Sequence, residues 1–327
     1  MRIKSYRQSL AGKALLAFGL GAALIIAAVG GASYRAIFLE IEQRSIRQLR
    51  DSAAQRARSQ ETRFALAREF HEVIKQDFLR RYRESSPDAE QRFDKLMMRY
   101  PDGAIRNRPE YADVVRYSTG WIHREVRPGP EFKRRWILYF DLSEKYAKLV
   151  TTRFINLYFL DATEAANMGF DDPARSGHVE WAADMPPDWP LRELEAVSIA
   201  TPARNPRRET VWAGPEYTPA YPQLLVPAVT PIDFEGAHVA TVASDTLLGD
   251  LDADTLHPDI PGAAHSVFRD DGRLIADRTY QSRIAEYRGN FFIAQTGDAR
   301  LRALLALATQ ATDLPRHGYD SQVDLHY

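Results

Sequence analysis

The feature that most constrains this chain is an uncharged apolar run of twenty residues, "ALLAFGLGAALIIAAVGGAS" (14–33). About twenty apolar residues are needed for an α-helix to cross the hydrocarbon layer of a bilayer. The segment before it, residues 1–13, is basic, and cytoplasmic flanks of membrane spans are enriched in Lys and Arg. Its basic residues are Arg2, Lys4, Arg7 and Lys13. We therefore predict a cytoplasmic segment 1–13, a transmembrane helix 14–33 and an extracytoplasmic remainder.

A cleaved signal peptide is the alternative, because small residues occur from Gly30 to Ala32. The apolar run is longer than the usual core of a signal peptide, and helix-forming sequence continues directly out of it. Both features favour an uncleaved anchor. A later apolar segment, "LRALLALATQA", is too short to span a bilayer and carries Arg302. We therefore predict a single membrane span.

The residues that follow the span favour one long helix over 34–85. No glycine or proline occurs from Tyr34 to Arg83, and most residues there are good helix formers. Apolar residues recur at multiples of three or four, which predicts a narrow buried stripe. They are Phe38, Ile41, Leu49, Ala53, Ala57, Phe64, Phe70, Ile74 and Phe78. Such a helix can serve as a dimer stalk that transmits a displacement, or it can simply span the long axis of its own domain.

Composition and motifs argue against several classes of function. The 43 Lys+Arg nearly balance the 44 Asp+Glu, so nothing indicates nucleic-acid binding. The absence of cysteine excludes disulfides, thiolate metal sites and cysteine nucleophiles. "HEVIK" lacks the second histidine of a helical zinc site, and "HVEW" lacks the cysteines of a zinc deaminase. We therefore expect no enzymatic activity, no metal and no cofactor.

The rest of the chain predicts an α+β fold. The segment "GPEFKRRWILYFDLSEKYAKLVTTRF" has helical spacing and runs into the strand "RFINLYFLDA". A hairpin is predicted for "LLVPAVTPI" and "AHVATVASD" (residues 224–245), and a second for "HSVF" and "RLIAD" (residues 265–277). An Asp-Gly turn joins the strands of the second hairpin. This repetition suggests two modules in series, each with an antiparallel sheet.

The anchor, the long helix and the segments "WAGPEYTP", "LLVPAVTPIDFEGAHVATVASDTLLGDL" and "SVFRDDGRLIAD" together resemble double Cache (dCache) sensor domains of bacterial transmembrane receptors. The resemblance covers residues 34–327 and is strongest from Trp212 to Asp277. It implies a long helix beside two stacked PAS-like modules. The membrane-distal module would comprise residues 86–251 and the membrane-proximal module residues 252–327.

The resemblance also implies a function. Such domains lie outside the bacterial inner membrane and bind a small molecule in the distal module. The long helix passes the signal to the membrane, and from there to a histidine kinase, diguanylate cyclase or chemotaxis output. The family implies a homodimer through the stalk helix. This sequence ends at "SQVDLHY", where a strand of the proximal module would begin. We therefore expect an incomplete second module and no output half.

Asp245 is the main candidate for ligand binding, because it matches the acidic residue that ends the last distal strand and contacts a ligand amine in such domains. One residue of strand register decides whether its side chain faces the pocket or caps the helix predicted from Leu247. For each further ligand-binding candidate the alternative is that its side chain only packs in the core or is exposed to solvent. These candidates are Tyr217, Trp212, Arg192, Arg153 and Tyr158, with Asn156 on the same strand as the last two. The Arg-x-Trp-Tyr element of amino-acid-binding members is incomplete in "LRELEAVSI", which argues against an α-amino-acid ligand.

Two other functions stay open at this point. One is a membrane-anchored structural protein that dimerises through its stalk. The other is an extracytoplasmic hydrolase without a recognisable motif, which would need a nucleophile and base or a metal cluster on the Trp-rich loops of residues 170–220.

Overall fold

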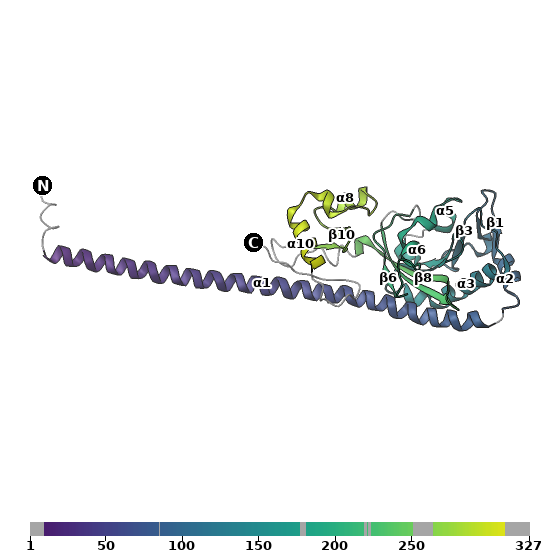
Figure 1. The fold of residues 1–327 in the computed structure, drawn as a ribbon, viewed down its shortest axis with the longest axis horizontal. Helices are drawn as coiled ribbons and strands as arrows, with labels where there is room; N and C mark the ends of the chain where they lie inside the picture. The colour runs from purple at the N-terminus through teal and green to yellow at the C-terminus, as the bar shows by residue number, and fades with distance from the viewer. Residues whose placement is uncertain are drawn as a thin grey trace. The chain divides into compact units, whose positions relative to one another are not determined.

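The computed structural model describes residues 10–84, 86–176, 181–218, 221, 224–250 and 264–310. The chain divides into two units, the first built on Met1–Gln55 and the second on Arg56–Gln322. Figure 1 labels the helices and strands along the chain.

Most secondary structure lies in the second unit. The helices are α1 (Leu10–Arg83), α2 (Ala89–Leu96), α3 (Pro130–Val150), α4 (Pro173–Ser176), α5 (Trp181–Asp184), α6 (Glu195–Ile199), α8 (Gln281–Glu286), α9 (Ile293–Thr296) and α10 (Ala299–Gln310), with short 3-10 helices η2 (Pro109–Tyr111) and η3 (Leu191–Glu193). The strands are β1 (Met97–Arg99), β2 (Ile105–Asn107), β3 (Thr119–Ile122), β4 (Asn156–Asp161), β5 (Ala166–Asp171), β6 (Val211–Trp212), β7 (Leu225–Phe234), β8 (Ala237–Leu247), β9 (Ser266–Phe268) and β10 (Leu274–Asp277).

The N-terminal part of α1 is the apolar segment seen in the sequence. Among the described residues, one helix is long and apolar enough to cross a membrane, and it comprises Gly12–Ser52. Its large apolar side chains are exposed, Phe18 and Ile26 among them. The predicted long helix is confirmed, since α1 continues without a break from Leu10 to Arg83. The expected cytoplasmic segment falls largely on residues 1–9, which lie outside the described residues.

An eight-stranded antiparallel sheet forms the centre of the second unit, in the order β1-β2-β3-β5-β4-β8-β7-β6. Strands β7 and β8 form the predicted hairpin, and their turn is tighter than expected. It consists of Glu235 and Gly236, both with positive φ, 50° and 81°. This backbone matches the twist of the two strands, so the strands extend to Phe234 and Ala237.

The sheet has one helical face and one face under short elements. The C-terminal part of α1 buries Ala67, Ile74 and Phe78 in the first core cluster, together with Trp136 and Tyr139 of α3. Side chains on the other face of the sheet pack under η3, α5 and α6 and form a second cluster. This follows from strand geometry, because successive side chains point to opposite faces. The predicted α+β class is therefore confirmed.

The second predicted hairpin is present as the two-stranded sheet β10-β9. It packs with α8, α9 and α10 around a third cluster that includes Leu274, Phe291 and Ile293. The strand predicted at "SQVDLHY" lies outside the described residues, as do residues 251–263 before the hairpin. The boundary between two modules therefore stays a prediction.

Candidate functional site

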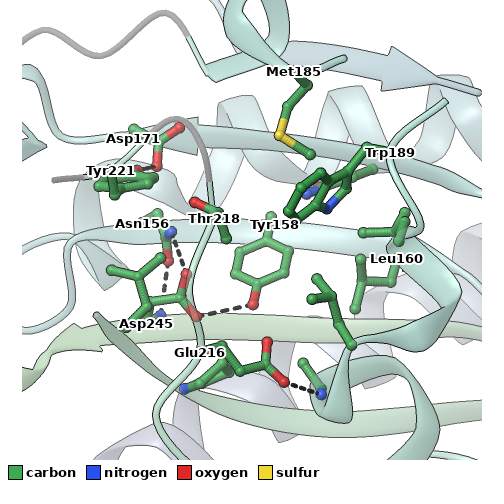
Figure 2. Close-up of a pocket in the computed structure, with 16 residues that line it drawn as sticks. Asn156, Tyr158, Leu160, Asp171, Met185, Trp189, Glu216, Thr218, Tyr221 and Asp245 are labelled. Atoms are coloured by element: carbon green, nitrogen blue, oxygen red, sulfur yellow. Dashed lines mark hydrogen bonds between the residues drawn. The ribbon is translucent and has the colours of Figure 1, made fainter. Parts of the chain in front are cut away.

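A cavity lies between the second face of the sheet and the loops above it. Together with the open solvent at its mouth it encloses about 610 Å³. Figure 2 shows its side chains. The lining residues are Asn156, Tyr158, Leu160, Asn167, Asp171, Met185, Trp189, Leu191, Leu194, Ala196, Glu216, Thr218, Tyr221, Leu225, Pro227 and Asp245.

Strand register places a row of polar side chains at one end of this cavity. Tyr158 pairs with Ala243 and the two strands are antiparallel, so Asn156 of β4 lies opposite Asp245 of β8. On its other side, Asn156 pairs with Asp171 of β5. Three neighbouring strands therefore contribute an acid, an amide and an acid side by side.

Asp245 is held by its neighbours. Asn156 Nδ2 donates to Asp245 Oδ2 at 2.8 Å, and the Tyr158 hydroxyl donates to Oδ1 at 2.8 Å. The backbone amide of Asp245 donates to Asn156 Oδ1 at 2.7 Å. Gly169 makes room for Tyr158, because a Cβ at this glycine would collide with the Cβ of the tyrosine. The carboxylate is thus fixed in one orientation.

Two more buried carboxyl groups face the same cavity. Asp171 accepts a hydrogen bond from the Tyr221 hydroxyl. The backbone of Glu216 forms an antiparallel β-bridge with that of Leu225. The carboxyl group of Glu216 accepts a hydrogen bond from the backbone amide of Ala196 at 2.6 Å. The exposed fractions of Asp245, Asp171 and Glu216 are 3%, 7% and 8%. Figure 2 shows Glu216 and Asp245 near the hydroxyl end of Tyr158.

Burial raises the pKa of all three carboxyl groups, because the charged form loses its hydration. The pKa rises to about 6 for Asp245, about 7 for Asp171 and about 8 for Glu216. The negative charge of Asp245 adds to the effect on the other two. Among the described lining residues there is no Lys, Arg or His. Three acidic side chains and no described basic one therefore line the cavity, and the charge of Arg273, outside the lining, acts against the rise in the pKa of Glu216.

The structure brings two of the predicted site residues into the cavity, Asp245 and Tyr158. Asp245 lies within β8, which runs on to Leu247, and its carboxylate bonds to Asn156 and Tyr158. The described hydrogen bonds of Asp245 therefore hold its carboxylate on the cavity side of the sheet. Strand β8 ends at Leu247, two residues later than the predicted strand, because its pairing with β7 continues to the pair Leu225 and Leu247.

The other four candidates lie outside the cavity lining. Arg153 is exposed before β4 begins, and exposed Arg192 donates to the carbonyl of Thr163. Trp212 packs edge-on against Phe64, with ring centroids 4.4 Å apart. Tyr217 points away from the cavity, since it follows Glu216 in extended chain, and the guanidinium of Arg288 lies 4.5 Å from its ring centre.

Sequence reasoning missed Asp171 and Glu216. A signal for Glu216 was present, because this residue directly precedes the Tyr217 candidate, and alternation in an extended segment puts neighbours on opposite sides. Asp171 gave no such signal. Its place beside Asn156 comes from the pairing of β5 with β4.

No protein-family model and no curated protein matches the chain. Several solved structures match it with low identity. The ligand-binding domain of the Pseudomonas aeruginosa PAO1 amino acid chemoreceptor PctB, in complex with L-Gln, is 16% identical. That match covers 63% of this chain and 65% of the solved ligand-binding domain, just under two thirds of that domain's length, with a TM-score of 0.33.

Two further matches are of similar kind. The extracellular domain of the putative histidine kinase mmHK1S-Z3 is 11% identical over 82% of this chain and 80% of its own, with a TM-score of 0.42. The ligand-binding domain of the Pseudomonas fluorescens chemoreceptor CtaA, in complex with L-leucine, is 16% identical. That match covers 51% of this chain and 57% of the solved domain, with a TM-score of 0.26. By their own descriptions these solved structures are ligand-binding and extracellular domains.

Proposed function

We propose that this chain is the extracytoplasmic sensor region of a membrane-anchored receptor of the double Cache type, and that its cavity binds a small organic cation. The observation that carries the proposal is the acidic lining of the cavity, in which Asp245, with a pKa of about 6, is largely ionised at neutral pH. Three buried carboxyl groups line it, and the described lining residues include no basic side chain. An ammonium group is the complement of such a site.

The energetics favour a cationic ligand over an anionic one. A buried carboxylate without a counter-charge is costly, which is why the three pKa values are raised. A bound ammonium ion offsets this cost, because it pairs with the carboxylate at close range. It also brings no additional negative charge into the buried site. A ligand carboxylate would instead meet like charge. The cavity therefore discriminates against α-amino acids while retaining an amine subsite at Asp245.

An organic cation fits better than a metal ion. Within the described part of the chain, no group of three His, Asp or Glu residues is placed to hold a metal. The three carboxyl groups are bound to different partners, Asp245 to Tyr158, Asp171 to Tyr221 and Glu216 to Ala196. Apolar side chains such as Leu160, Met185 and Leu225 provide surface for a hydrocarbon body.

The route from the cavity to the membrane runs through α1 in this proposal. His71 of α1 makes hydrogen bonds to Thr230 of β7 and to Ser244 of β8, each at 2.9 Å. Ser244 is the neighbour of Asp245 in β8. A ligand that prefers one arrangement of β8 shifts the population of helix positions through these contacts. The N-terminal span and dimerisation through the stalk complete the proposal.

The test is calorimetric titration of the full chain in detergent micelles with phenethylamine, butylamine and the matched carboxylate-bearing amino acids. We expect the amines to bind and phenylalanine to bind at least tenfold more weakly. Asp245→Asn keeps the shape of the side chain and one accepting oxygen but removes the charge, so amine binding should fall at least tenfold, with thermal melting used to verify that the variant folds. Binding of amino acids in preference to amines would overturn the proposal.

A further inference from the structure

The cavity has a second polar end, distinct from the acidic row. Asn156 pairs with Asp171 at one end of β4, whereas Leu160 pairs with Asn167 at the other. Four residues of extended strand separate these positions by about 13 Å. Figure 2 shows Trp189 and Leu160 on the side of Tyr158 that is away from Asp245. The cavity is therefore elongated, with an acidic end and a far end.

Three polar atoms of the cavity lining are buried without a hydrogen-bond partner among the described residues. They are Asn167 Oδ1, Trp189 Nε1 and Thr218 Oγ1. The contrast with Asp245 is clear, since both of its carboxylate oxygens are bonded to neighbouring side chains. Buried polar groups in proteins are almost always paired, so a set of unpaired ones in a binding cavity indicates groups reserved for a ligand.

The chemistry of these atoms defines what they can bind. The indole N–H of Trp189 only donates, the amide oxygen of Asn167 only accepts, and the hydroxyl of Thr218 does both. Figure 2 shows Thr218 beside Asn156 and Tyr221, so the atoms of Asn167 and Trp189 are the ones at the far end. A ligand hydroxyl satisfies these two atoms, because its oxygen accepts from Trp189 while its hydrogen is donated to Asn167. A carboxylate does not, since it cannot donate and no described basic residue lines the cavity.

The body of the ligand must cross an apolar stretch between the two ends. Leu160, Met185 and Leu191 line this part of the cavity, beside the ring of Tyr158. Resting on the proposed function, we propose that the ligand is an elongated ammonium compound with an apolar or aromatic body and a hydroxyl group at the end remote from its nitrogen. Phenolic amines and long amino alcohols belong to this class.

The experiment compares three probes that differ by one group each: tyramine, phenethylamine, which lacks the hydroxyl, and tyrosine, which adds a carboxylate. Each is titrated calorimetrically into the full chain in detergent micelles. We expect tyramine to bind about tenfold more tightly than phenethylamine, because only its hydroxyl pairs with the far-end atoms. Tyrosine should bind more weakly than either amine.

Variants locate the effect. Trp189→Phe keeps an aromatic ring and removes the N–H, so it should reduce the preference for tyramine to within about twofold and leave phenethylamine binding nearly unchanged. Trp121→Phe is the matched control: its indole N–H is also buried and unpartnered, but Trp121 is not among the lining residues. This control should retain the preference. Asn167→Leu, which removes the amide oxygen, provides a second far-end variant if Trp189→Phe fails to fold, as judged by thermal melting.

The outcomes separate the two proposals. Equal affinities for tyramine and phenethylamine would overturn the hydroxyl inference and leave the amine-binding function standing. No binding of either amine would overturn both. A preference for tyramine that survives both Trp189→Phe and Asn167→Leu would overturn the assignment of the far-end atoms.

Discussion

The Nε2 atom of His71 lies 2.9 Å from the hydroxyl oxygen of Ser244, so a hydrogen bond joins helix α1 to the strand that carries Asp245. The other ring nitrogen of His71 lies 2.9 Å from the hydroxyl of Thr230 in β7. Ser244 and Asp245 are neighbours whose side chains point to opposite faces of the sheet. One strand thus carries a helix contact on one face and a cavity carboxylate on the other.

The first prediction concerns this contact. His71→Phe should lower the free energy of unfolding by about 2–4 kcal/mol, because it leaves the buried Ser244 hydroxyl without its partner and weakens the bonding of Thr230. Ser244→Ala should cost less in the His71→Phe background than in the wild type. Chemical denaturation of the four proteins of this cycle measures the coupling. Strict additivity would show that the two side chains do not interact.

The pH dependence of stability provides a second prediction. Burial lowers the pKa of His71 from 6.5 to about 3, so the folded chain keeps this ring neutral. The unfolded chain takes up the proton below about pH 6.5, and the contribution of His71 is therefore lost as the pH falls from about 6.5 towards 3. When the pH falls from 7 to 4, the free energy of unfolding should decrease more in the wild type than in His71→Phe, by on the order of 3 kcal/mol. Parallel pH profiles of the two proteins would contradict this.

Glu216 should act in the opposite direction. Its pKa is raised from 4.5 to about 8, so the folded chain binds the proton more strongly than the unfolded chain. Stability from this group is present below about pH 4.5 and is lost as the pH rises through about 8. Glu216→Gln cannot ionise and should flatten the decline between pH 5 and pH 8 by on the order of 3 kcal/mol. The exposed Glu193→Gln is the matched control and should melt with the wild-type pH profile.

A fourth prediction concerns Glu195, the neighbour of Ala196 in the cavity wall. Its carboxylate pairs with Arg269 and Arg273, each at 2.5 Å, and so ties α6 to the hairpin of β9 and β10. Burial by itself raises the pKa of Glu195, but the hydrogen bond from Arg269 and the charges of both arginines hold it below its usual value. Glu195 therefore stays ionised at neutral pH.

Glu195→Gln should loosen this hairpin, because partly buried arginines lose their counter-charge, at a cost of about 2–3 kcal/mol. Hydrogen exchange of the amides of β9 and β10 should then accelerate, while exchange in β4 and β8 stays unchanged. Glu193→Gln serves as the control here as well. Unchanged exchange in β9 and β10 would show that the ion pairs do not hold the hairpin.

Much of the fold is legible in the sequence because its signals are local. The helix of α1 follows from a long run without glycine or proline, and the hairpin of β7 and β8 follows from alternating apolar residues around a glycine turn. The end of β8 was missed for a physical reason. Pairing with Leu225 holds Leu247 in the strand, and a partner strand is a non-local feature.

The sequence by itself determined the apolar segment long enough to span a membrane, the long helix and the α+β class, and it made Asp245 the leading site candidate. Each of these rests on composition, spacing or resemblance along a continuous segment. Only the tertiary structure decided the character of the site. Asp171, Glu216 and Asp245 come from segments far apart in the chain, and strand pairing and burial bring them into one cavity. The raised pKa values arise from that shared burial, and desolvation is a property of the folded surroundings that no single segment carries.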